Sequence, residues 1–82
     1  MEKKLVSKVD NFNAIMSRSD RVSRLSYAID ASGKFATLYL CNEPQMNYGT
    51  YQCELYRGDI EHAIEAVRML LMTLNFELNL GY

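Results

Sequence analysis

The fold is decided by residues 59–74, which read DIEHAIEAVRMLLMTL. Apolar side chains recur in this stretch at steps of three and four residues, and this spacing places them on one face of an α-helix. They are Ile60, Ala63, Ile64, Val67, Leu70, Leu71 and Leu74. Asp59 stands at the N-cap position, where its carboxylate can accept hydrogen bonds from the first turn. So wide an apolar face must be covered, and we expect the rest of the chain to cover it.

A first helix is predicted over residues 2–18, where apolar side chains again follow steps of three and four residues. Its covered face comprises Leu5, Val9, Phe12 and Met16, with Val6 and Ile15 beside them. The lysines of this stretch fall elsewhere on the helix circumference. Residues 17–20, which read SRSD, form a polar stop after the helix.

After this stop the period of the apolar residues changes from 3.6 to 2, which is typical of β-strands. Three strands are predicted, over residues 21–30, 35–42 and 48–56. Residues 31–34, ASGK, fit a tight turn in which Gly33 can adopt the positive φ of a hairpin. Residues 43–47, which include Pro44, form the loop between the second and third strands.

The turn determines which side chains share a face of the sheet. A two-residue turn at Ser32 and Gly33 puts Leu25 opposite Leu40, and a matching alignment of the third strand puts Leu38 opposite Leu55. The helices would then cover a face made of Leu25, Tyr27, Ile29, Ala36, Leu38, Leu40, Tyr51, Cys53 and Leu55. The opposite, open face would carry Arg24, Ser26, Ala28, Phe35, Thr37, Tyr39, Cys41, Gln52, Glu54 and Tyr56.

A three-residue turn with a glycine bulge is the alternative, and it would slip the first pairing by one residue. Phe35 and Tyr39 would then face the helices, while Leu38 and Leu40 would point outward. In either register the middle strand has large apolar side chains on both faces. Helices on one side therefore leave an apolar surface that needs a cover. We expect that cover to be a second copy of the chain, the tail over residues 75–82, or a different partner.

Residues 75–82 allow two interpretations. The helical stripe continues through Leu78, and Gly81 could stop the helix, yet Phe76, Leu78 and Leu80 also alternate as in a strand. We favour a helix that frays near residue 75 and a tail that packs back as a short extended segment. The chain is thus predicted to be a single α+β domain over residues 1–82, a three-stranded antiparallel β-meander with two helices on one face.

The composition is that of a globular protein, with 49% hydrophobic and 23% charged residues and a formal net charge of −1. No apolar run approaches the roughly 20 residues of a membrane span. The first residues, MEKKLVSKVD, lack the apolar block of a secretory signal. We therefore expect a cytoplasmic protein that does not bind membranes. Basic residues concentrate in residues 1–34 and acidic residues in 35–82, so the molecule is expected to be dipolar.

Enzymatic chemistry has few candidate residues in this sequence. His62 is the only histidine, and its position in the first turn of the second helix predicts an exposed surface residue. Cys41 and Cys53 lack metal-type spacing and are expected to be small buried residues. Glu61 and Glu65 lie one turn apart, which is typical of a solvated helix face. We expect no catalytic residues, no metal and no cofactor, and the chain is predicted not to be an enzyme.

The order helix, three strands, helix resembles that of double-stranded-RNA-binding domains. The resemblance covers most of the chain but is one of element order alone, without matching motif residues. That family binds phosphates with lysines at the start of its last helix, where residues 58–62 here read GDIEH. A different route is single-stranded nucleic acid, with bases stacked on Tyr39, Tyr56 and Phe35. We keep nucleic-acid binding through the aromatic and basic residues of the open face as the alternative function.

The function we predict is a small non-enzymatic protein-interaction module that works as a homodimer. A short chain without a catalytic set is also typical of virus- or mobile-element-encoded inhibitors, which bind and occlude a host protein. The predicted binding residues are Phe35, Tyr39, Tyr56, Arg24 and Lys34. Aromatic and arginine side chains dominate the energy of protein interfaces when they are buried, which is the reason for this choice.

Overall fold

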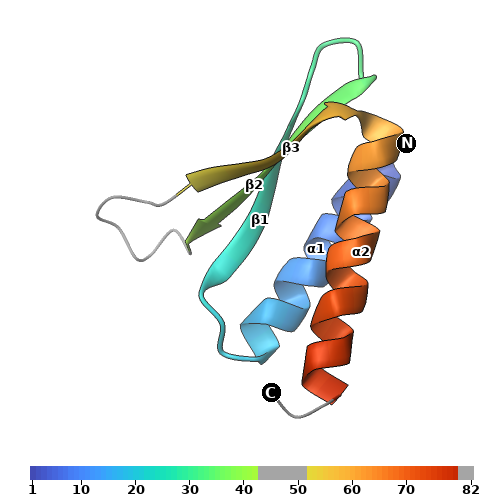
Figure 1. The fold of residues 1–82 in the computed structure, drawn as a ribbon. Coiled ribbons are helices and arrows are strands. Elements are labelled where there is room, and N and C mark those ends of the chain that lie inside the picture. Colours follow the sequence, from blue (N-terminus) through green and yellow to red (C-terminus); the bar gives the residue numbers. More distant parts are fainter. Residues whose placement is uncertain (43–51, 80–82) are drawn as a thin grey trace.

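The computed structural model describes residues 1–42 and 52–79 and confirms the predicted α+β fold. Its elements are α1 (Glu2–Arg18), β1 (Ser23–Ile29), β2 (Phe35–Asn42), β3 (Gln52–Asp59) and α2 (Ile60–Asn79). The strands form one antiparallel sheet in the order β1-β2-β3. Both helices lie side by side on one face of this sheet, and both begin at the end that holds the β1–β2 hairpin (Figure 1).

The core lies between the two helices and the sheet. Its buried apolar side chains are Leu5, Val9, Phe12, Met16, Leu25, Ala36, Leu38, Ile60, Ala63, Val67, Leu71 and Leu74. The four α1 residues are the predicted ones, and all the α2 residues in this set belong to the predicted stripe. Tyr27 was predicted on the covered face, but it is 37% exposed because β1 is an edge strand.

The register of the first hairpin agrees with the two-residue-turn prediction. Leu25 pairs with Leu40 and Tyr27 with Leu38, which rules out the slipped alternative. The turn itself is longer, because the N–H of Asp30 donates to the carbonyl of Phe35 at 3.1 Å and closes a four-residue connection. Gly33 has a φ of +73° within it, as predicted. The side chains of Phe35 and Tyr39 therefore point away from the helices.

The third strand differs from the prediction at its end and in one pairing. It continues to Asp59, three residues beyond the predicted end at Tyr56, while the predicted loop over 43–47 and the predicted strand residues 48–51 lie outside the described residues. Leu40 pairs with Cys53 as expected, but Leu38 pairs with Tyr56 and not with Leu55. Leu55 is the extra residue of a β-bulge, so two residues of β3 oppose one of β2 there. The bulge reverses the predicted alternation after this point. It turns Tyr56 toward the helices, leaves Leu55 44% exposed, and places the next residue, Arg57, on the opposite face.

The prediction that the second helix frays near residue 75 was wrong. The helix α2 continues to Asn79, so residues 75–79 are neither extended nor available to cover the open face; residues 80–82 lie outside the described part of the chain. Two contacts explain the longer helix. Leu78 packs against the core, and the carboxylate of Glu77 forms an ion pair with Arg21 at 3.2 Å.

The free edge of β1 is occupied by a side chain of α1. The amide nitrogen of Asn13 donates to the carbonyl of Leu25 at 2.9 Å, and its amide oxygen accepts the Leu25 N–H at 2.7 Å. Asn13 therefore satisfies both backbone groups that Leu25 turns away from β2. An unpaired strand edge can pair with another chain, so this contact protects β1 from such pairing.

We expect Asn13→Ala to lower the free energy of unfolding by about 1–3 kcal/mol, because two partly buried hydrogen bonds are lost and the Leu25 groups keep no partner. Urea unfolding followed by circular dichroism measures this change. Asn11→Ala is the matched control, since Asn11 is exposed on the same helix and should cost only a few tenths of a kcal/mol. Equal losses in the two variants would contradict the role given to Asn13.

Candidate functional site

The candidate site is the face of the sheet that points away from the helices. No described element covers this surface, which we call the open face (Figure 1). Strand pairing and the bulge place these residues on it: Arg24, Ser26 and Ala28 of β1, Phe35, Thr37, Tyr39 and Cys41 of β2, and Gln52, Glu54 and Arg57 of β3. It combines two aromatic rings with small and charged side chains.

The aromatic residues of the open face lie on the middle strand. Phe35 is 53% exposed, a large fraction for a phenylalanine in a sheet, and Tyr39 is half-buried. A shallow hollow of about 450 Å³ lies beside them, lined in part by Ala28, Phe35, Thr37 and Arg57. The small side chains of Ala28 and Thr37 leave room there for an inserted group. The open face thus has both an exposed ring and a depression next to it.

Three charged side chains contribute to this face. Arg57 donates to the carboxylate of Glu54 at 2.7 Å, and this hydrogen bond and the carboxylate charge raise the pKa of Arg57. The Arg57 side chain is 69% exposed, so a partner could still approach it. Arg24 donates through Nη1 to the backbone carbonyls of Arg21 and Ser23, at 2.5 and 2.7 Å. Its guanidinium is therefore held toward the segment that precedes β1.

The structure places three of the five predicted binding residues on the open face. These are Arg24, Phe35 and Tyr39. Lys34 was predicted at the rim, but it lines a different hollow with Met1, Gly33, Asp59, Ile60 and Glu61, where the two helices begin. Alternation explains this result, because Lys34 precedes Phe35 and so points to the other side.

The prediction that Tyr56 lies on the open face was wrong. Its ring packs against the core, and its hydroxyl donates to the backbone carbonyl of Asp59 at 3.1 Å. Burial and the negative charge of Asp59 raise the pKa of this hydroxyl. The ring lies close over Gly58, where an added Cβ would collide with it. Tyr56 therefore connects the end of β3 to the start of α2. Arg57 lies on the open face, where Tyr56 had been predicted.

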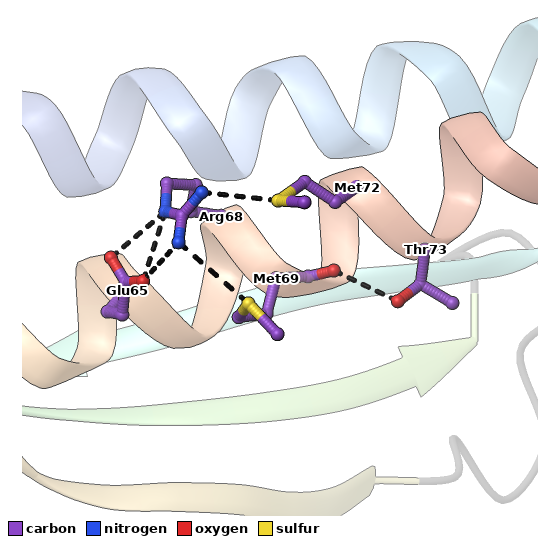
Figure 2. A network of polar contacts seen from close by, with 5 residues as sticks. All are labelled: Glu65, Arg68, Met69, Met72 and Thr73. Atoms are coloured by element: carbon purple, nitrogen blue, oxygen red, sulfur yellow. Dashed lines mark hydrogen bonds and ion pairs between the residues drawn. The ribbon is translucent and has the colours of Figure 1, made fainter.

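A second exposed apolar surface lies on the outer side of α2. Met69, Met72 and Phe76 are 51%, 54% and 66% exposed. Arg68 is ion-paired with Glu65, and its Nη1 donates to the sulfur of Met72 at 3.2 Å (Figure 2). The hydrogen bonds and the charge of Arg68 lower the pKa of the Glu65 carboxyl. In the same way, Glu65 raises the pKa of the Arg68 guanidinium. Glu65 thus forms an ion pair on a solvated helix face.

Chemistry for catalysis or metal binding is sparse in the described residues. Across residues 1–42 and 52–79, no three His, Cys, Asp or Glu side chains gather closely enough to hold a metal ion. Cys41 and Cys53 are free thiols, half-buried on opposite faces of the sheet. The prediction that the protein is not an enzyme stays a prediction.

Neither α1 nor α2, the helices of this part of the chain, is long and apolar enough to cross a membrane.

Comparison of the chain with protein-family models, with curated proteins and with solved structures gives no match. The open face is therefore the feature from which a function can be inferred.

His62 is exposed, as predicted, and it belongs to the N-cap of α2. The Asp59 carboxylate accepts the backbone N–H of His62 at 3.2 Å and lies 2.6 Å from its Nδ1. The hydrogen bond to Asp59, with the charge of this carboxylate, raises the pKa of His62 above its ordinary value of 6.5. The same contacts lower the pKa of Asp59. Protonated His62 and ionised Asp59 therefore stabilise each other at the start of the helix.

Because the pKa of His62 is raised by folding, its contribution to stability is fully present below about pH 6.5 and is lost as the pH rises through the folded-state pKa. We expect the NMR titration midpoint of His62 to lie above 6.5, and the Tm to fall slightly between pH 6 and pH 8.5. His62→Gln should reduce this fall. A midpoint at or below 6.5 would contradict the pairing with Asp59.

Proposed function

We propose that the protein is a non-enzymatic protein-interaction module and that its binding surface is the open face of the sheet. The observation that carries this proposal is the uncovered position of Phe35 and Tyr39 on a face where no described element packs. An exposed aromatic ring and a half-buried one beside a hollow and an arginine are features typical of interface hot spots. The surface combines these rings with side chains of both charges, which suits a protein partner.

The charges on this face favour protein over nucleic acid as the partner. Nucleic-acid binding requires a groove or patch of unneutralised cations that follows the phosphates. Here Arg57 is paired with Glu54, and the formal net charge of the chain is −1. Tyr56, one of the three rings proposed to stack bases, points to the core. The narrower hypothesis of a virus- or mobile-element-type inhibitor stays a prediction from the sequence.

We expect the double variant Phe35→Ser, Tyr39→Ser to lose association with protein partners, whether these are second copies or other proteins. The measurement compares tagged wild-type and variant protein in affinity capture from the native host, followed by mass spectrometry. Phe76→Ser is the matched control, because Phe76 is an exposed phenylalanine on the other side of the molecule. Circular dichroism and thermal melting establish that each variant is folded.

Unchanged capture by the folded double variant would contradict the proposal that the open face is the binding surface. Loss of capture by Phe76→Ser alone would indicate that the binding surface lies on α2. Salt-sensitive retention of the wild-type chain on single-stranded RNA or DNA, lost in the double variant, would support the nucleic-acid alternative.

A further inference from the structure

We propose that the occupant of the open face is a second copy of this chain, packed face to face about a two-fold axis. The axis lies parallel to the sheet and perpendicular to the strands, at the level between Thr37 and Tyr39. This inference rests on the proposed function, because it fills the surface assigned there. Two sheets that pack with their strands nearly aligned, about 10 Å apart, form a common sandwich.

The strand pairing shows which side chains would meet in such a dimer. On the open face the residues form cross-strand rows: Asp30 with Phe35, Ala28 with Thr37 and Arg57, Ser26 with Tyr39 and Glu54, and Arg24 with Cys41 and Gln52. Asp59 also pairs with Phe35, but its carboxylate is hydrogen-bonded to His62 of α2 and does not belong to this face. The two-fold axis turns the second sheet over and reverses its strands, while each strand still lies over its own counterpart. The first row then faces the fourth row of the other copy, and the second row faces the third.

Charge complementarity is the observation that points to a second copy. In this arrangement Arg57 of each copy faces Glu54 of the other. Arg24 and Asp30 also lie in opposing rows, but backbone carbonyls before β1 hold the Arg24 guanidinium and Ser32 binds the Asp30 carboxylate within its own turn. The pair of Arg57 and Glu54 therefore carries the complementarity. The guanidinium of Arg57 meets a carboxylate of the other copy, and no like charges are opposed. Arg57 and Glu54 are 69% and 46% exposed, so each can bridge to the other copy while keeping its partner in its own chain. Two-fold symmetry makes this pair occur twice.

The shape of the face agrees with this arrangement. Tyr39 of each copy lies opposite Thr37 of the other, next to the hollow that Ala28, Thr37 and Arg57 line in part. The ring can enter this hollow, whose volume of about 450 Å³ is ample for an aromatic side chain. Phe35 lies opposite the small side chain of Cys41. Large groups thus face small ones across the interface, which permits close packing of the two sheets.

A charge-swap experiment tests the dimer. The variants Glu54→Arg and Arg57→Glu each oppose like charges across the proposed interface, so each alone should dimerise at least about tenfold more weakly than the wild type. An equimolar mixture should restore association, because arginines at 54 and 57 of one chain then face glutamates of the other. Sedimentation velocity over a range of micromolar concentrations measures the dimerisation of the wild type, of each single variant and of the mixture.

The chain offers a matched control pair on the opposite side. Glu65 and Arg68 are the same residue types at the same i,i+3 spacing, but they lie on α2. Glu65→Arg and Arg68→Glu should leave the wild-type dimer unchanged. A wild-type chain that is monomeric at hundreds of micromolar would overturn the inference. So would single variants that dimerise normally, or a mixture of folded variants that stays monomeric.

These outcomes are distinct from failure of the proposed function. If the wild type is a monomer and the Phe35, Tyr39 double variant still loses capture of a different protein, the inference fails and the open face remains the binding surface. If the double variant keeps both self-association and capture, the open face is not the interface and both proposals fail.

Discussion

The structure depends on one packing constraint: two helices can cover only one face of a three-stranded sheet. Leu38, at the centre of β2, is fully buried against them. The same strand carries Phe35 and Tyr39 on its other side, where no described element lies. The core is therefore complete on one side of β2, while the aromatic residues on the other side remain at the surface. The candidate function follows from this asymmetry.

Much of the fold could be predicted from the sequence because the relevant signals are periodic. Apolar spacing gave the bounds of α1 and its four buried residues, and the acidic residue before Ile60 gave the start of α2. The first hairpin was predicted as an element, but its register was left open between two turns. The observed register pairs Leu25 with Leu40 and keeps the leucines of β1 and β2 on one face. Where two periods overlapped, after Leu74, the sequence alone could not decide between them.

The features that were missed leave no periodic signal. A bulge adds one residue to β3, but the alternation from Gln52 to Tyr56 reads the same with or without it. The predicted residues of the candidate site were consequently wrong on this strand, where Arg57 and not Tyr56 lies on the open face. The role of Asn13 was equally hidden, because Asn11 and Asn13 look alike in the sequence and only the second reaches the edge of β1. Both features depend on tertiary contacts.

The two sheet edges are protected by different means, a side chain at β1 and the Leu55 bulge at β3. The bulge also determines whether β3 can lose a residue without a change in its pairing. The cross-strand partners on either side of Leu55 are adjacent residues of β2, so removing Leu55 would leave every pair in place, with Glu54 still opposite Tyr39 and Tyr56 still opposite Leu38. One residue of β3 is thus not required by the pairing. Related chains could lose it and keep the same open face, at the cost of a straighter edge that is more prone to pair with other strands.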